Sequence, residues 1–261
     1  MVNYSFSLID FEYFLLILVR ITAFVFAAPL FGQSGVPNQT KIGLSFLTSV
    51  MLYNVLDRPA LEYSDIIGYA VYVLIEGITG LLIGFAANIC SSIVLFAGNI
   101  IDMDIGLSMA TEFNPEMNNE VTVTGNLYYY FVFLLLVASD MHVYILRAVC
   151  DSFRVVPIGG AQFEWNHLLA AMTRYMGDLF VIGFRIFLPV FACIMILNCI
   201  LGIMAKVAPQ MNMFAVGIQM KVLVGMLVLF LTVFMLPKIA DFIFTEIKQM
   251  VVLIIEGMYG G

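Results

Sequence analysis

The chain has few charged residues and little of what soluble enzymes use for catalysis. Only 11% of its 261 residues are Asp, Glu, Lys or Arg, against about a quarter in soluble domains. It has two histidines, His142 and His167, and neither belongs to an H-E-x-x-H zinc motif. Neither a G-x-S-x-G nucleophile elbow nor a phosphate-binding G-x-x-x-x-G-K-[ST] loop occurs. The sequence therefore indicates a protein that is not an enzyme, and it predicts no cofactor.

Cysteine is also scarce. The four cysteines are Cys90, Cys150, Cys193 and Cys199. They lie in apolar or isolated contexts and form no C-x-x-C pair, so neither metal binding nor redox chemistry is supported. A calcium loop starting at Asp102 is excluded as a motif, because its glycine comes one position early and Phe113 stands where the last ligand belongs.

Positive charge is missing from a long part of the chain. No Lys or Arg occurs from Pro59 to Leu146, whereas nine acidic residues do. The net charge of the whole chain is −7. Because recognition of phosphate needs clustered cations, nucleic-acid binding is disfavoured.

Long apolar runs fill most of the sequence, and hydrophobic residues make up 62% of it. Six apolar segments favour helices that suit a hydrocarbon core of about 30 Å. They comprise residues 13–30, 42–56, 66–101, 127–146, 179–204 and 213–236. The predicted class is an all-α membrane protein that forms a single module, 1–261.

The third segment is too long for one ordinary crossing, since 36 residues of helix reach about 54 Å. It must bend, split or protrude. Taken as one span, it gives a six-span arrangement with the acidic 102–126 loop outside, in rough agreement with the positive-inside rule. Taken as two spans, that order breaks, and the sequence leaves both alternatives open.

A short polar turn divides the last two apolar segments, within residues 205–221. Pro209 cannot donate a backbone hydrogen bond and disfavours helical geometry in Ala208, so the first helix is expected to end there. Asn212 is available to cap the second helix. The turn therefore predicts a helical hairpin.

The same turn resembles a known signature. Pro209-Gln210, Asn212, Phe214, Gly217 and Lys221 resemble the Pro-Gln-x-Asn-x-Phe-x-x-Gly segment of the FliR family, the R/T-type subunits of the flagellar and injectisome type III secretion export gate. Further matches follow in the family's order: Arg20, Pro29-Leu30-Phe31-Gly32, Pro37, Lys41, Glu76, Gly80, Gly84, Phe85, Ala97-Gly98, Gly106 and Pro115. The resemblance covers nearly the whole chain.

This resemblance implies helical hairpins packed into a helical ring with homologous subunits. It implies a structural and gating subunit of the flagellar type III export gate, which forms part of the pore for unfolded export substrates and is needed for flagellum assembly. The implied partners are FliP-type, FliQ-type, FlhB-type and FlhA-type components, the substrates and membrane lipid. The implied location is the bacterial cytoplasmic membrane, at the flagellar basal body.

Two alternative functions stay open. One is the corresponding subunit of an injectisome. The other, more remote, is a secondary transporter or ion channel in which Glu76 or Asp140 relays protons. The two halves of the sequence show no evident repeat, which disfavours a transporter.

The 102–126 loop is the candidate gating element, because it combines five acids with methionine and phenylalanine and has no basic residue. Flexible Met and aromatic side chains can block a channel while adapting to its shape. In the resembled family this region is thought to plug the closed pore. The candidate plug residues are Gly106, Met109, Glu112, Phe113, Asn114, Pro115 and Met117. A solvent loop with apolar residues is the alternative.

A second group of residues predicts close helix packing. Four-residue steps place Glu76, Gly80, Gly84 and Asn88 along one helix stripe. Gly217, Lys221 and Gly225 repeat the pattern in the last apolar segment. The partner of each stripe is either this chain itself or another subunit. Arg20 and Glu76 lie inside apolar runs, where ions need a partner or water, but the sequence does not assign the pairs.

The C-terminal segment, 238–258, is expected to be an amphipathic helix. One side carries Asp241, Thr245, Lys248 and Glu256, and the other carries apolar residues. Such a helix lies in the membrane interface or docks on another subunit.

Overall fold

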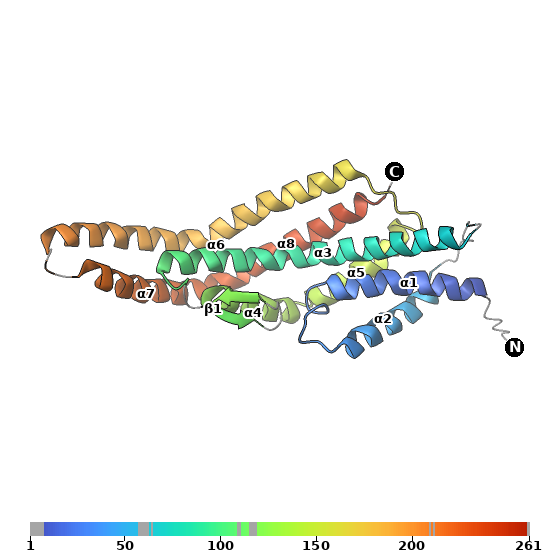
Figure 1. Ribbon diagram of the computed structural model, residues 1–261, viewed down its shortest axis with the longest axis horizontal. Helices are drawn as coiled ribbons and strands as arrows, with labels where there is room; N and C mark the ends of the chain where they lie inside the picture. Colours follow the sequence, from blue (N-terminus) through green and yellow to red (C-terminus); the bar gives the residue numbers. More distant parts are fainter. Residues whose placement is uncertain are drawn as a thin grey trace. The chain divides into compact units, whose positions relative to one another are not determined.

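The structure, a computed structural model, describes residues 8–56, 63, 65–108, 111–114, 119–208, 210 and 212–259. In this part of the chain helices dominate, which confirms the predicted helical class (Figure 1). The helices are α1 (Leu8–Ala27), α2 (Asn38–Tyr53), α3 (Ile66–Ile105), α4 (Val123–Ala138), α5 (Met141–Val155), α6 (Trp165–Val207), α7 (Met213–Thr232) and α8 (Leu236–Glu256), with a 3-10 turn, η1 (Val233–Met235).

One small hairpin departs from the all-α expectation. Strands β1 (Thr111–Asn114) and β2 (Asn119–Thr122) pair antiparallel, with Thr111 opposite Thr122. The flanking helices also extend further than hydropathy indicates, because α3 continues to Ile105 and α4 starts at Val123. The connection expected over 102–126 is therefore confined to 106–122.

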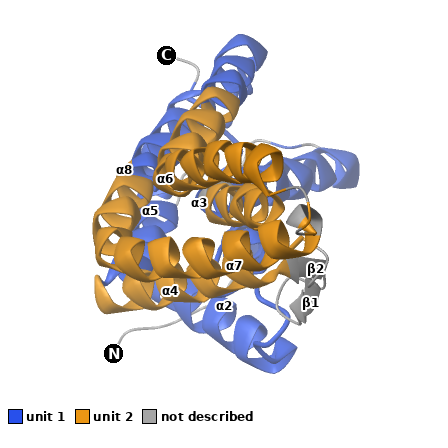
Figure 2. Ribbon diagram, turned by 90° about the vertical axis from the view of Figure 1, so that its left-hand side faces the viewer, with its two compact units in different colours: residues 1–89, 140–174, 246–261 blue, residues 90–139, 175–245 orange. Residues whose placement is uncertain are grey.

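The chain divides into two compact units, coloured in Figure 2. The first comprises residues 1–89, 140–174 and 246–261, and the second comprises residues 90–139 and 175–245. Helices α3, α6 and α8 contribute residues to both units. The single module expected over 1–261 stays a prediction.

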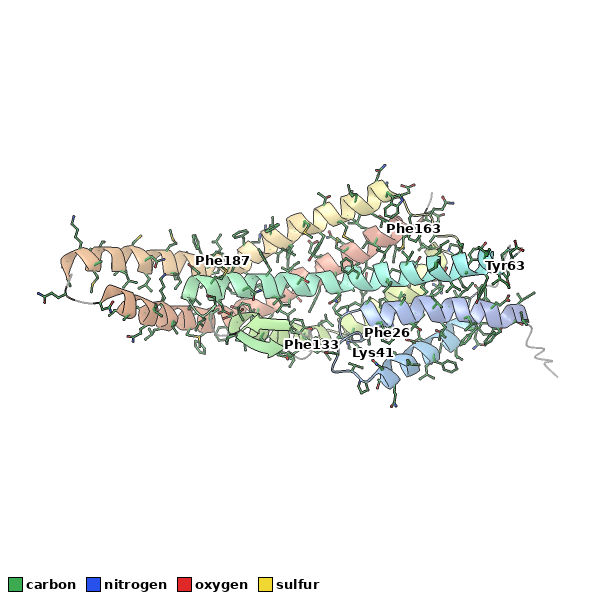
Figure 3. The ribbon with its side chains drawn as sticks, in the orientation of Figure 1. Phe26, Lys41, Tyr63, Phe133, Phe163 and Phe187 are labelled. Carbon is green, nitrogen blue, oxygen red and sulfur yellow. The ribbon has the colours of Figure 1, made fainter. Side chains whose placement is uncertain are left out.

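In the first unit α1 is held to α2 by the turn between them. Leu30 adopts a left-handed backbone conformation with φ 73°. A side chain at Gly32 would overlap the Phe26 carbonyl oxygen. Lys41 of α2 is 5% exposed, donates a hydrogen bond to the Gly32 carbonyl at 3.0 Å and lies 5.4 Å from the centre of the Phe26 ring (Figure 3). This ammonium therefore fixes the turn after α1.

Glu12 ties the start of α1 to Tyr63 before α3 and to Tyr69 in the first turn of α3. The Tyr63 hydroxyl donates to the Glu12 carboxylate, and the Tyr69 hydroxyl donates to the Glu12 carbonyl oxygen at 3.1 Å. The hydrogen bond to this carboxylate and its negative charge help raise the pKa of Tyr63 to about 12.

Helix α1 packs closely on α3 at two glycines of the predicted stripe. A Cβ at Gly80 would overlap the Arg20 carbonyl oxygen, and one at Gly84 would lie 2.8 Å from both the Ala27 Cβ and the Phe24 carbonyl oxygen. Only residues without a side chain permit this approach. Asn88, the last member of the stripe, has an exposed side chain.

The apolar segment 127–146 was expected to form one helix, and that expectation is wrong. The structure instead has two helices, α4 and α5, separated by Ser139 and Asp140. Asp140 has φ 57°, a conformation that short polar side chains tolerate. Two polar residues in succession therefore turn the chain within an otherwise apolar run.

The described residues contain three helices, or four if the bent α4–α5 pair counts as one, that are long and apolar enough to cross a membrane. The six spans are not found, because α2 has only 16 residues and α1 carries Asp10, Glu12 and Arg20. The third predicted segment is a single helix of 40 residues. Segments 213–236 and 238–258 join through η1 into one stretch, Ala215–Glu256.

The two longest candidate spans leave most of their apolar surface uncovered by the chain. In an apolar stretch of 18 residues within Trp165–Val207, only 28% is buried by the rest of the chain. In the corresponding stretch within Ala215–Glu256, 22% is buried. Lipid or other subunits must cover the remainder, since exposed apolar surface on this scale is unfavourable in water. The protein is therefore embedded in a membrane or a membrane assembly.

We predict that Gly80→Ala weakens the α1–α3 packing by about 1–3 kcal/mol, because the added methyl forces the two backbones apart. Gly77→Ala is the matched control on the same helix, since a Cβ there meets only the Val19 Cγ1, at 3.7 Å. This control is expected to be neutral or slightly stabilising. Thermal unfolding in detergent measures both variants, and equal losses would contradict the packing account.

Candidate functional site

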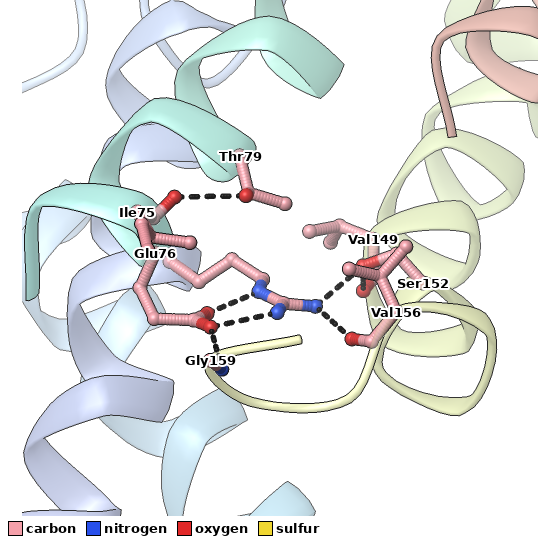
Figure 4. A network of polar contacts seen from close by, with 8 residues as sticks. Ile75, Glu76, Thr79, Val149, Ser152, Val156 and Gly159 are labelled. Carbon is pink, nitrogen blue, oxygen red and sulfur yellow. Dashed lines mark hydrogen bonds and ion pairs between the residues drawn. The ribbon is translucent and has the colours of Figure 1, made fainter. Parts of the chain in front are cut away.

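A buried ion pair joins α1 to α3 in the first unit (Figure 4). The Arg20 Nε donates to the Glu76 Oε2 at 2.5 Å, and the Arg20 Nη2 donates to Oε1 at 2.9 Å. Both side chains are 0% exposed. A bidentate geometry of this kind fits the planar guanidinium to the carboxylate.

Helix α5 and the segment after it complete the surroundings of this pair. The Arg20 Nη1 donates to the Val156 carbonyl at 3.0 Å and to the Ser152 Oγ at 3.5 Å. The Gly159 backbone N–H donates to the Glu76 Oε1 at 2.9 Å. The Phe153 ring centre lies 4.1 Å from the Arg20 Cζ.

This network connects three parts of the first unit that are far apart in the sequence. The two ions face each other and form further hydrogen bonds to their surroundings. Such contacts compensate the loss of hydration that buried charges suffer in a protein interior. The arrangement therefore positions these helices relative to one another within the first unit.

A second polar site, in the second unit, closes the ends of the 106–122 connection. The Asp102 carboxylate, which is 0% exposed, accepts hydrogen bonds from the Thr124 backbone N–H at 2.8 Å and from the Thr124 hydroxyl at 2.5 Å. Thr124 lies in the first turn of α4, where N–H groups lack intrahelical partners and negative charge is favoured. Asp102 of α3 thus caps α4 from outside.

Two further contacts hold the same helix ends together. The Thr122 hydroxyl donates to the Asn99 Oδ1 at 2.8 Å. A side chain at Gly98 would overlap the Gly125 backbone, so α3 and α4 approach closely there. We call Asp102, Asn99, Thr122 and Thr124 the clasp. The β1–β2 hairpin extends from this clasp.

The structure describes the backbone of four of the seven candidate plug residues. Gly106 ends α3 with φ 93°, a conformation that favours glycine. The backbones of Glu112, Phe113 and Asn114 form β1. Met109, Pro115 and Met117 lie outside the described residues. The hairpin therefore unites three of these positions in one strand, and their role as a plug stays a prediction.

The predicted helical turn is only partly described. Helix α6 ends at Val207, next to the residue expected to end it, and Pro209 lies outside the described residues. Gln210 lies in the turn. Asn212 stands at the N-cap of α7, where its side chain accepts from the Ala215 N–H at 3.5 Å.

The remaining predicted packing residues lie in α7, and so does Phe214 of the turn motif. Gly217 is buried, and a Cβ there would meet the Leu201 Cδ1 at an ordinary distance of 3.6 Å. Lys221 is half-buried and interacts electrostatically with Asp104 of α3. The predicted residues are thus distributed between the two units.

Sequence reasoning missed the clasp. From the sequence, Asp102 is considered as an acid of the loop and as the start of an excluded calcium motif. An acidic residue at the end of a long apolar run, followed by a Thr-rich helix start, is nevertheless a signal for a cap supplied by another helix. Ser152 and Gly159 carry no such signal, because their positions depend on tertiary packing. No group of three or more His, Cys, Asp or Glu that could hold a metal occurs in the part of the chain described.

The family model and the individual proteins that match this chain agree with one another. The family model "Bacterial export proteins, family 1" matches residues 11–247. The chain is 30% identical to the flagellar biosynthetic protein FliR of Bacillus subtilis (strain 168) over 227 residues, which are 85% of this chain and 87% of that protein. It is 28% identical to the protein of the same name from Escherichia coli (strain K12) over 246 residues, 92% and 91% of the two chains.

We predict that Arg20→Leu and Glu76→Leu each lower the free energy of unfolding by about 3–5 kcal/mol, because each leaves a buried charge without its partner. The double variant is expected to lose less than the sum of the two. Arg154→Ala is the control. Its pair with Asp151 is exposed, at 73% and 68%, and 3.9 Å long, so the loss is expected to stay within about 0.5 kcal/mol.

Unfolding of the detergent-solubilised protein measures all four variants. Strictly additive losses in the double variant would show that the two charges do not depend on each other. That result would contradict the role of the pair.

Proposed function

Because the chain belongs to the bacterial export proteins, family 1, and thus to the flagellar biosynthesis and export proteins, we propose that it is a non-catalytic structural and gating subunit of the flagellar type III protein export gate. It forms part of the pore through which unfolded export substrates pass, in the bacterial cytoplasmic membrane at the flagellar basal body. The observation that carries this proposal is the family match over 11–247. The flagellar names of the relatives favour this system over an injectisome.

The uncovered apolar surfaces support a role within an assembly. The apolar 18-residue stretches of the two longest spans are only 28% and 22% buried by the chain itself. Neighbouring subunits are suitable covers for such surfaces, because helices of matching shape pack on them without exposing polar backbone. We propose FliP-type and FliQ-type subunits as these neighbours, with FlhB-type and FlhA-type components completing the apparatus.

The clasped hairpin supports a gating role. The clasp holds the ends of α3 and α4 in a fixed relation, so the hairpin can be displaced without disturbing the long helices. Its segment carries methionine, phenylalanine and acidic residues. Apolar side chains would close a pore to water and ions, and the acids would stay in contact with water.

The proposal is tested first by deleting the gene in its own bacterium. We expect secretion of flagellar substrates to stop, since a gate that lacks a pore subunit does not conduct. Export is measured by the amount of flagellar protein in the culture medium. Expression of the gene from a plasmid is the control, and normal secretion in the deletion strain would overturn the proposal.

A second prediction concerns the hairpin. Residues 113–120 are replaced by Asn-Gly, which favours a two-residue hairpin turn. The paired positions Thr111–Thr122 and Glu112–Val121 stay in the chain, and so does the clasp. We expect normal yield of the complex and leakage of ions through the closed gate.

A matched control replaces residues 113–120 by eight glycine and serine residues. This variant keeps the length of the hairpin and removes the apolar and acidic side chains of these residues. It therefore separates the effect of loop length from that of the side chains. Ion flux is measured in membrane vesicles that contain equal amounts of complex. Vesicles as tight as those of the wild type, with the shortened protein present, would contradict the gating role.

A further inference from the structure

A cavity of about 220 Å³ lies in the second unit, beside Pro189 of α6 and the turn η1. Its lining includes Tyr128 of α4, Arg185 and Pro189 of α6, Thr232 at the end of α7, and Lys238 and Phe242 of α8. Most of its wall is apolar, and its polar groups are two cations and two hydroxyls. No carboxylate belongs to the lining.

The proline in α6 and the 3-10 turn η1 alter the backbone hydrogen bonding next to this cavity. Pro189 has no N–H, so the carbonyl of Arg185 receives no hydrogen bond from the usual position four residues later. On the other side, η1 separates α7 from α8. Irregular helix segments at membrane depth commonly line binding sites, because their free backbone groups need partners.

Among the described residues, neither cation of the cavity has an anionic partner. No carboxylate among the described residues forms an ion pair with Arg185 or Lys238. The Arg185 guanidinium carbon lies 5.6 Å from the centre of the Phe242 ring. Both cations belong to candidate membrane spans. Charges in such spans need a partner or contact with water, and an anion from outside the chain would serve as that partner.

We propose that this cavity binds the headgroup of an anionic phospholipid. The phosphate is neutralised by Arg185 and Lys238, as in the basic pockets between membrane helices that hold acidic headgroups. The hydroxyls of Tyr128 and Thr232, which lie 3.4 Å apart, face the polar part of the lipid.

The surroundings of the cavity favour a lipid over a free anion. Side chains near the lining residues in sequence are large, apolar and exposed: Phe184 at 49%, Leu188 at 60% and Phe234 at 78%. Acyl chains would cover them. An inorganic anion would satisfy only the two cations and would leave these apolar side chains uncovered.

The test uses the full chain, purified in detergent and stripped of lipid. Phosphatidylglycerol and phosphatidylcholine with identical acyl chains are titrated separately, and native mass spectrometry counts the bound lipid. We expect phosphatidylglycerol to bind more tightly. Arg185→Gln and Lys238→Gln are each expected to weaken its binding about fivefold, the usual effect of one cation near a lipid phosphate, with phosphatidylcholine unchanged.

Lys206→Gln is the matched control, because Lys206 is an exposed cation on the same helix and does not line the cavity. It is expected to leave lipid selectivity unchanged. A third titration uses inorganic phosphate as a competitor, and it should not displace the lipid at equal concentration.

Three results would overturn the proposal. They are equal binding of the two lipids to the wild-type chain, an equal loss in Lys206→Gln, and displacement by inorganic phosphate alone. The comparison of the two lipids on the wild-type chain needs no variant, so it tests the proposal even if a substitution prevents folding. Selectivity that vanishes when the other gate subunits are present would show that a protein partner occupies the cavity instead.

Discussion

The first unit depends on one buried ion pair. Arg20 and Glu76 are 0% exposed and hydrogen-bonded to each other at 2.5 Å and 2.9 Å. An isolated charge at this depth would be strongly destabilising, so α1, α3 and the end of α5 must come together for either ion to be tolerated. The glycines beside the pair allow the backbones of α1 and α3 to approach closely enough for it to form.

The second unit solves a different problem, which is how to anchor a non-helical segment between long apolar helices. Asp102 supplies the negative charge that the start of α4 lacks in its own sequence, and the close contact of Gly98 with Gly125 brings the two helices within reach. The hairpin leaves the helices at this fixed point.

The sequence predicted what depends on local chemistry. It predicted the end of α6 near Pro209, the cap at Asn212 and the close approach at Gly80 and Gly84, because proline, asparagine and glycine act over a few residues. It did not predict which charges pair, because pairing requires the register between distant helices. The bend at Asp140 and the helical extension to Ile105 were missed because hydropathy averages over single polar residues.

The central claim is that the β1–β2 hairpin lies in the path of exported protein. A photoreactive amino acid at Glu112, in strand β1, tests it most directly in cells in which an export substrate is stalled in the gate. The same label at Met51 of α2, which is 70% exposed, is the control. The account predicts crosslinks to the stalled substrate from Glu112 and none from Met51. Substrate crosslinks that are absent at Glu112, in cells that contain assembled and labelled complex, would contradict it.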